Sequence, residues 1–281
     1  MWQDATESNR PMKLSVVLAA KNEAENLPQL IAEICTALRP ETRFEIVVVD
    51  DGSTDETPRV LSEVQKQCPE LVIIRHQQSC GQSFAMVTGV LESGGDMIAT
   101  LDADGQNDPA DLPKMLTVLL APTENGEQVS LVAGHRQRRK DNFWRILCSR
   151  TANAVRQAVL RDGTPDTGCG IRVFRRDTFL ALPRFSHMHR FLPALVIRCG
   201  GVVTSVAVNH RPRIHGNSHY DTLGRLTAGI MDLCGVAWLI HRSVVPLVES
   251  RTGSGNDIRQ LDDLRVYGAD DFHESLPRSV A

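Results

Sequence analysis

Short apolar segments alternate with amphipathic stretches through the first half of the chain. Residues 14–20 form a β-branched run, and leucines and isoleucines at helical spacing follow it. Residues 44–49, 71–75 and 97–101 repeat the apolar run, and helical patterns separate them. Strands that alternate with helices usually pair in parallel, because each helix returns the chain to the same end of the sheet. The sequence therefore predicts an α/β fold around a mostly parallel sheet.

The amino-acid composition excludes some classes of protein. The chain has 281 residues, of which 42% are hydrophobic and 23% charged, as in ordinary soluble globular proteins. The net charge of -3 gives no overall case for nucleic acid as a partner. Seven cysteines without a C-x-x-C pair indicate reduced thiols, and residues 1–12 lack the apolar core of a secretory signal. We therefore expect a cytoplasmic protein.

Two acidic pairs follow predicted strands. Asp50 and Asp51 come after the second strand, and Asp102 and Asp104 come after the fourth. Ligands of open α/β sheets bind at the carboxyl ends of the strands, where the loops converge. Two carboxylates one residue apart, with the oxygen of Gln106 close behind, suit a hard divalent cation. Each acidic residue taken singly is also typical of a turn or helix cap.

A basic segment covers residues 135–161 and carries a net charge of +7. Phe143 and Trp144 lie among its arginines. A basic amphipathic helix of this kind suits an anionic membrane surface or phosphate groups, and a solvated helix face is an equal alternative. A second apolar stretch, residues 226–240, would reach only about 22 Å as a helix, so it should not span a bilayer. Its apolar stripe is expected either to close the core or to lie on a membrane or partner.

Three motifs carry a family resemblance. Residues 15–27 (SVVLAAKNEAENL), 47–55 (VVVDDGSTD) and 101–106 (LDADGQ) resemble the family 2 glycosyltransferases of the GT-A fold. Residues 166–170 (DTGCG), 188–194 (MHRFLPA) and 210–218 (HRPRIHGNS) resemble the dolichol- or polyprenyl-phosphate sugar synthase branch of that family. The resemblance covers about residues 14–242 and leaves out the tail.

The resemblance implies a Rossmann-like central sheet flanked by helices, followed by a C-terminal amphipathic helix. The expected divisions are a polar N-terminal extension (1–12), the GT-A domain (13–221), an amphipathic juxtamembrane segment (222–248) and a polar acidic tail (249–281).

It also implies a set of site residues. A divalent cation, Mg²⁺ or Mn²⁺, is expected on Asp102, Asp104 and Gln106. The nucleotide sugar is expected on Ala19, Glu23, Asp51, Asp102 and Ala103, with Asp51 hydrogen-bonded to the donor base. The catalytic group is expected to be Asp104, Asp166, Arg136 and Arg213, the two arginines clamping phosphates. Arg145, Arg150 and His219 are assigned to the acceptor phosphate, His219 replacing a lysine common in the family.

The function implied is an inverting transferase. It would move one sugar from a nucleotide diphosphate sugar to a polyprenyl monophosphate, as a peripheral protein on the inner face of the membrane. A phosphate acceptor is already an anion, so no strong general base is required. An integral membrane partner is expected wherever an anchor is needed. Two alternatives stay open: transfer to a saccharide or lipid hydroxyl with Asp166 as base, and a non-catalytic nucleotide-sugar-binding subunit. Cys169 is expected to be a packing residue, and Trp238 a core or interface residue.

Overall fold

The computed structural model describes residues 13–136, 154–212 and 222–242, with only the backbone described for residues 222–228. Its strands form one seven-stranded sheet in the order β3-β2-β1-β4-β6-β5-β7. The strands are β1 (Leu14–Ala20), β2 (Phe44–Asp50), β3 (Leu71–Arg75), β4 (Met97–Asp102), β5 (Val129–Arg136), β6 (Arg172–Arg175) and β7 (Val202–Val208). This α/β sheet confirms the predicted fold class.

Helices connect the strands. The α-helices are α1 (Leu27–Leu38), α2 (Thr57–Gln65), α3 (Gln82–Glu92), α4 (Leu112–Leu120), α6 (Arg176–Leu180), α7 (Leu192–Arg198) and α8 (Thr222–His241). Short 3₁₀ turns, η1 (Pro109–Asp111) and η2 (Met188–Arg190), precede α4 and α7, and residues 154–160 are helical. Pro109 thus opens a 3₁₀ turn, and α4 begins only after it.

The direction of β6 decides what meets at the ligand end of the sheet. β1 pairs in parallel with β2 and β4, and β5 pairs in parallel with β7. β6 lies between β4 and β5 and runs antiparallel to both. The carboxyl ends of β1, β2, β4 and β5 therefore meet the amino end of β6. The residues just before β6 join the loops that follow the parallel strands.

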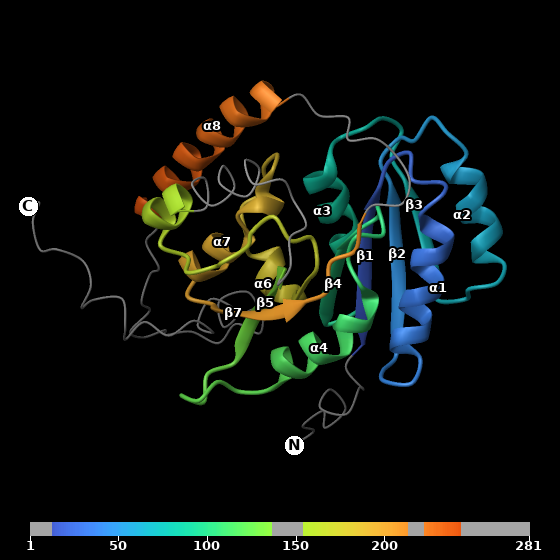
Figure 1. Ribbon diagram of the computed structural model, residues 1–281, viewed down its shortest axis with the longest axis horizontal. Coiled ribbons are helices and arrows are strands. Elements are labelled where there is room, and N and C mark those ends of the chain that lie inside the picture. Colours follow the sequence, from blue (N-terminus) through green and yellow to red (C-terminus); the bar gives the residue numbers. More distant parts are fainter. Residues whose placement is uncertain (1–12, 137–153, 213–221, 243–281) are drawn as a thin grey trace, which may run out of the picture.

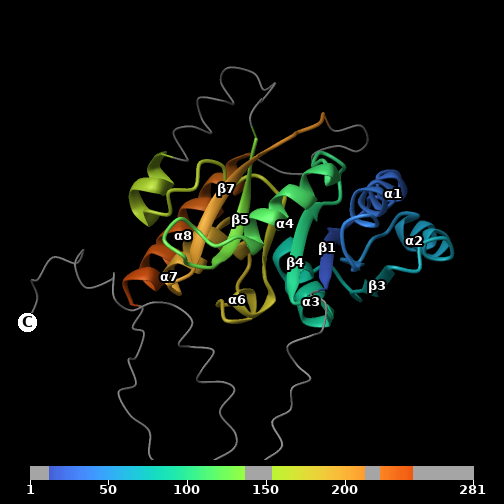
Figure 2. The same cartoon turned by 90° about the horizontal axis from the view of Figure 1, so that it is seen from below.

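Helices cover both faces of the sheet, as Figures 1 and 2 show. Helices α1, α2 and α4 lie on one face, where leucines and isoleucines of α1 and α4 pack on alternate residues of β1 and β2. Helices α3, α6, α7 and α8 lie on the other face. The two buried clusters use opposite sides of the same strands, because successive strand residues point to opposite faces. This burial explains the near-continuous apolar runs of the parallel strands.

Helix α8 is two-sided over its described side chains. Val236 is buried in the second core cluster, and Leu233, Ala237 and Ile240 pack against that cluster. The core-closing alternative is thus confirmed for this part of the predicted stripe. Ile230, Met231 and Trp238 instead expose 54%, 74% and 62% of their surface, so Trp238 is not a core residue.

The basic segment differs from its predicted form at its start. His135 and Arg136 belong to β5, where they pair with Ala207 and Val208 of β7. The prediction of a basic helix from residue 135 was therefore wrong for these two residues, because strand pairing holds them. Residues 137–153 lie outside the described part of the chain. Among the described helices, none is both long enough and apolar enough to cross a bilayer.

Candidate active site

The turn after β4 carries the predicted cation ligands. Asp102 is the last residue of β4, and Asp104 and Gln106 follow in the turn. Gly105 has a φ of 73°, which a glycine adopts without strain. One carboxylate oxygen of Asp104 accepts a hydrogen bond from the backbone N–H of Gln106 at 3.1 Å. Asn107 closes the turn, since its side-chain oxygen accepts the backbone N–H of Asp102 at 3.1 Å.

The Asp102 carboxylate is enclosed by residues from two other elements. Gln82, the first residue of α3, donates its side-chain N–H to Asp102 at 2.9 Å. Gly170, just before β6, leaves no room for a side chain, because a Cβ there would lie 2.1 Å from Asp102 Oδ2. The Gly170 carbonyl accepts the hydroxyl of Thr100 in β4 at 3.1 Å. The predicted DTGCG motif therefore meets the predicted cation turn.

A second buried charge lies beside this carboxylate. Arg172 exposes 4% of its surface and donates to the carbonyl of Thr167 at 2.9 Å. Burial raises the pKa of Asp102, and the nearby Asp104 raises it further, while Arg172 acts in the opposite direction. Burial lowers the pKa of Arg172, against the attraction of Cys169, Asp102 and Asp166. Charges of both signs are thus concentrated at the end of β4.

Arg136 and Asp166 form a bidentate ion pair. Arg136 Nε and Nη2 donate to the two oxygens of Asp166 at 2.6 and 2.8 Å. Burial alone would lower the pKa of Arg136, but the hydrogen bonds and charge of Asp166 raise it above its ordinary value. Arg136 is held in place at the end of β5, near Asp102. Its predicted role as a phosphate clamp stays a prediction.

The segment after β7 fastens the cation turn to the domain. The backbone N–H of Arg211 donates to the carbonyl of Gln106 at 2.9 Å. Its guanidinium donates to Glu33 of α1 at 2.6 Å and to Asp108 at 2.7 Å. The backbone N–H of Asn209 donates to Asp111 at 2.6 Å. Asn209, just before the HRPRIHGNS motif, and Arg211, at its start, therefore support the turn that carries Asp104.

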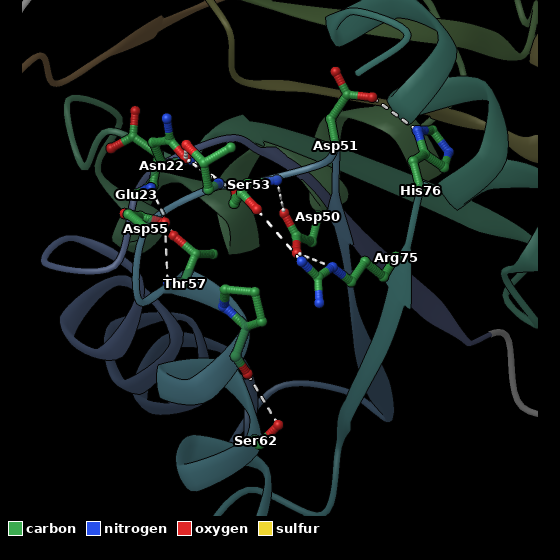
Figure 3. Close-up of polar contacts among 12 residues, drawn as sticks. Asn22, Glu23, Asp50, Asp51, Ser53, Asp55, Thr57, Ser62, Arg75 and His76 are labelled. Atoms are coloured by element: carbon green, nitrogen blue, oxygen red, sulfur yellow. Dashed lines mark hydrogen bonds and ion pairs between the residues drawn. The ribbon is translucent and has the colours of Figure 1, made fainter. Parts of the chain in front are cut away.

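Asp51 is buried, and both of its carboxylate oxygens have hydrogen-bonding partners. Oδ1 contacts Nδ1 of His76 and accepts the backbone N–H of Cys80, each at 2.8 Å. Oδ2 accepts the Ser79 hydroxyl at 2.7 Å and the Gly81 N–H at 2.8 Å. Burial alone would raise the pKa of Asp51, but these hydrogen bonds lower it. Asp51 thus fixes the loop before α3. Figure 3 shows its contact with His76. Its reading of a base stays a prediction.

The loop after β1 is tied to the loop after β2 (Figure 3). The backbone N–H of Asn22 donates to the Ser53 hydroxyl at 2.9 Å, and that of Glu23 donates to the Thr57 hydroxyl at 3.0 Å. Glu23 accepts a side-chain hydrogen bond from Asn26 at 2.6 Å. The capping interpretation is confirmed for Asp50, which accepts the backbone N–H of Ser53 at 2.9 Å.

Two predicted nucleotide contacts are alanines. Ala19 pairs with Val49 of β2 and Asp102 of β4, so it stands between the two acidic strand ends. Ala103 exposes only 4% of its surface and packs in the first core cluster. A ligand at Ala103 is therefore left mainly with backbone atoms.

Four predicted site residues lie outside the described part of the chain: Arg145, Arg150, Arg213 and His219. Of the basic segment, Arg156 is described and buried, and it pairs with Asp162 and donates to the Thr164 carbonyl at 2.7 Å. Arg136 and Arg156 are therefore neutralised within the protein. Their charges are not part of a basic surface.

Several functional neighbours were missed from the sequence. Gln82 and Arg172 belong to none of the motifs quoted above, and His189 lies in the MHRFLPA motif but was given no role. His189 Nδ1 lies 2.7 Å from the Ser83 hydroxyl, next to Gln82. Cys169 is buried at 1% exposure, and burial raises its pKa. These values support the packing interpretation of Cys169.

Solved structures share this fold. Glucosyl-3-phosphoglycerate synthase from Mycobacterium tuberculosis, in complex with Mn²⁺, UDP and glucosyl-3-phosphoglycerate, superposes with a TM-score of 0.56. It is 19% identical, over 80% of each chain. Mannosyl-3-phosphoglycerate synthase from Rubrobacter xylanophilus gives a TM-score of 0.59 at 18% identity, over 86% of this chain and 79% of that one. At these identities the likeness shows the fold, which is GT-A as expected.

Curated relatives are closer in sequence. Dodecaprenyl-phosphate galacturonate synthase from Rhizobium johnstonii is 33% identical over 243 residues, which cover 84% of this chain and 69% of the relative. Undecaprenyl-phosphate 4-deoxy-4-formamido-L-arabinose transferase from Yersinia enterocolitica is 32% identical over 221 residues, covering 78% and 65%. The chain thus spans about two thirds of the length of these relatives.

The family assignment follows from the sequence match. The model of the family described as glycosyl transferase family 2 matches residues 15–182. This range runs from β1 to the residues just after α6 and includes the cation turn and the Arg136–Asp166 pair. The chain belongs to glycosyl transferase family 2.

Proposed function

We propose that this chain transfers one sugar from a nucleotide diphosphate sugar to a polyprenyl monophosphate, with inversion at the sugar carbon. The names of the curated relatives support the acceptor class, since they are polyprenyl-phosphate sugar transferases. The structural observation that best supports this reaction is a charge cluster at the end of β4. In it, Asp102, Asp104 and Asp166 interact with Arg136 and Arg172. Three carboxylates and two guanidinium groups leave this cluster net negative.

A net negative cluster does not by itself favour a diphosphate. A divalent cation reverses the sign, and carboxylate and amide oxygens are the ligands that Mg²⁺ and Mn²⁺ prefer. The raised pKa of Asp102 reflects burial and the repulsion of Asp104, both of which a cation would offset. The oxygen donors of Asp102, Asp104 and Gln106 are therefore suited to Mg²⁺ or Mn²⁺. Mn²⁺ and Mg²⁺ accompany UDP in solved structures of the same fold.

In the proposed reaction, an acceptor phosphate oxygen bonds to the sugar carbon as the bond to the nucleoside diphosphate breaks. Asp102, Asp104 and Gln106 would hold the cation, which supplies stabilisation of the leaving diphosphate when bound. Asp166 orients Arg136, whose charge faces the same region. Arg172 supplies a buried positive charge that does not depend on the cation. The acceptor is an anion throughout, so no side chain has to remove a proton from it.

Transfer to a hydroxyl is the second candidate, and it requires a base. Asp166 is the carboxylate that the sequence motifs place for this role. Both of its oxygens accept hydrogen bonds from Arg136. Oδ1 also accepts the backbone N–H of Gly168 at 3.2 Å and Oδ2 that of Arg136 at 3.4 Å. Proton removal by Asp166 would have to displace one of these four donors, which favours the phosphate acceptor.

We also propose that the protein is peripheral on the inner face of a membrane. The exposed side chains of Ile230, Met231 and Trp238 on α8 support an apolar contact there. Arg138, Arg139 and Lys140 supply positive charge to the predicted basic segment. An integral membrane partner stays part of this proposal.

Metal dependence tests the catalytic part. Asp104→Ala, or chelation of the wild type, should lower transfer of labelled sugar into organic-extractable lipid by about a thousandfold or more, because charge stabilisation worth several kcal/mol is lost. Asp96→Ala is the matched control, since Asp96 is exposed and precedes β4 at the opposite end of that strand. Full transfer in excess EDTA would contradict the assignment of the cation site.

A further inference from the structure

A carboxylate, an imidazole and a thiol meet beside the loop that precedes α3. Asp51 follows β2, His76 follows β3, and Cys80 lies in the loop itself. One ligand atom from each residue lies within 4.8 Å of the other two. Figure 3 shows the Asp51–His76 part of this group. The cation turn after β4 contributes no residue to it.

Contacts around the group fix the orientation of two of its members. The Asp51 carboxylate is held by the backbone N–H groups of Cys80 and Gly81, both at 2.8 Å. His76 Nε2 lies 3.0 Å from the hydroxyl of Thr88 in α3. Metal-binding histidines commonly use their second ring nitrogen in this way, and it sets the ring orientation.

The loop before α3 is also fixed by its packing against Gly52. Gly52 has a φ of 69°, and a Cβ there would lie 2.8 Å from the backbone nitrogen of Ser79. The chain therefore passes directly over Gly52 before it reaches Cys80. Cys80 and its neighbours are placed by backbone packing, and Cys80 is exposed. A solvated ion has access to the group from the Cys80 side.

We propose that Asp51, His76 and Cys80 form a zinc site. A mixed oxygen, nitrogen and sulfur donor set suits Zn²⁺, whereas Mg²⁺ and Mn²⁺ prefer oxygen ligands. Three protein ligands leave a fourth tetrahedral position for water. This site is separate from the Mg²⁺ or Mn²⁺ position of the proposed function, and its existence does not depend on that function.

Proton balance is satisfied by groups that are present. In the tautomer with the ring proton on Nδ1, His76 donates to Asp51 and the Thr88 hydroxyl donates to Nε2. With zinc on Nδ1, the ring proton moves to Nε2 and the Thr88 hydroxyl becomes the acceptor. The Cys80 thiol loses its proton to solvent, so one proton is released for each ion bound. Ligand atoms around zinc are about 3.3 Å apart, so the 2.8 Å contact between His76 and Asp51 must open by about 0.5 Å.

A second sulfur group, Cys35, Cys68 and Glu70, is a poorer candidate. Both thiols are buried, and burial and the neighbouring Cys35 raise the pKa of Cys68 to about 12. Glu70 accepts two hydrogen bonds from the Arg39 guanidinium at 3.0 and 3.1 Å. A metal would have to deprotonate buried thiols beside a fixed cation. This group provides an internal control.

Cobalt(II) binding tests the site, because Co²⁺ replaces Zn²⁺ and its thiolate bond gives a near-ultraviolet charge-transfer band. The full chain is titrated with Co²⁺ in excess Mg²⁺ and without nucleotide. We expect the band in the wild type, its displacement by Zn²⁺, and its loss in Cys80→Ser. His76→Gln, which can keep a hydrogen bond to Asp51, should weaken binding at least tenfold. Absence of the band in the wild type would overturn the proposal.

Matched variants identify which cysteine provides the thiolate ligand. Cys234→Ser removes an exposed thiol on α8, and Cys68→Ser alters the second sulfur group. Both should keep the band, as should Asp104→Ala in the cation turn. A band that survives Cys80→Ser and disappears in Cys68→Ser would overturn the site in favour of the other group.

One consequence of the site rests on the proposed function. Zinc would occupy Asp51, the residue assigned to the donor base, and should weaken nucleotide binding at least tenfold in the wild type but not in Cys80→Ser. If cobalt binds as expected and nucleotide affinity does not change, the zinc site stands and the base-reading role of Asp51 fails. The two failures are therefore distinguishable.

Discussion

At the scale of single residues, the contact between Asp102 and Gly170 leaves no space for even a methyl group. A Cβ at Gly170 would lie 2.1 Å from one Asp102 oxygen and 2.6 Å from the other. Gly170→Ala should therefore displace the carboxylate without removing a proposed ligand. We expect at least a tenfold loss of Mn²⁺ affinity by calorimetry and a larger loss of transfer.

Gly229→Ala is the matched control, because no neighbouring atom lies within 4 Å of a Cβ there. It places alanine inside helix α8 and should stabilise the fold by about 0.5–1 kcal/mol. Unchanged Mn²⁺ affinity in a folded Gly170→Ala protein would show that Asp102 is not a cation ligand.

His189 should make stability depend on pH. The Ser83 hydroxyl oxygen accepts the backbone N–H of His189 at 3.3 Å and lies 2.7 Å from Nδ1 of its ring. Burial, followed by the charge of Arg172, lowers the His189 pKa from 6.5 to about 3. The unfolded chain therefore binds a proton below pH 6.5 that the folded chain does not bind. Stability is complete above about pH 6.5 and falls as the pH drops towards 3.

Denaturant unfolding at pH 7.5 and pH 5.0 measures this effect. The wild type should lose about 2 kcal/mol more than His189→Gln between the two values. His241→Gln, at the exposed end of α8, should behave as the wild type does. Equal losses in the wild type and His189→Gln would contradict a buried neutral histidine.

At the scale of elements, the segment after β7 acts as a brace for the cation turn. Arg211 links that turn to α1 through Glu33 and Asp108. These pairs are partly exposed, so Arg211→Ala should cost only about 1 kcal/mol of stability. Because its guanidinium helps to fix the turn, cation affinity should still fall about threefold to tenfold, measured by Mn²⁺ titration.

Arg39→Ala separates bracing from general stability. Arg39 forms a comparable pair with Glu70, but in the second sulfur group rather than at the cation turn. Arg39→Ala removes this exposed pair and should leave Mn²⁺ affinity unchanged. A brace role for Arg211 is refuted if both variants affect affinity equally.

Periodicity predicted the elements up to α4 well, because β1, β2 and β4 are buried on both faces and the helices between them each turn an apolar face to the sheet. The second half was harder to predict. β6 has only four residues and begins and ends with an arginine, Arg172 and Arg175, and its antiparallel direction depends on pairing with β4 and β5. Local sequence does not determine such long-range pairing. The start of the basic segment was misjudged for the same reason, since β7 holds it as strand.

At the scale of the whole molecule, one surface is expected to face a membrane. Anionic vesicles should carry the protein in flotation at low salt, through Arg138, Arg139 and Lys140, each favoured by about 1 kcal/mol near the surface. High salt or reversal of these charges to glutamate should release it. Reversal of Lys66 to glutamate on the α2 side is the control. No flotation at any salt would remove the membrane from the proposal.

The candidate site was only partly predictable. The motifs gave Asp102, Asp104 and Asp166, because each has a fixed spacing after a strand or before a glycine. Gln82 comes from α3 and Arg172 from β6, and only the folded sheet brings them near Asp102. Arg136 and Asp166 were both predicted from the family resemblance, but their pairing across 30 residues is apparent only in the fold.

The ion pair between Arg136 and Asp166 also bears on how much change the connection from β5 to β6 can tolerate. It fastens together the two points where the chain leaves β5 and returns towards β6. The ends of the intervening stretch are therefore fixed whatever its length, and doubling such a connection costs only about 0.6 kcal/mol in closure entropy. Changes of sequence or length within this stretch should therefore leave the sheet and its acidic turn unaltered.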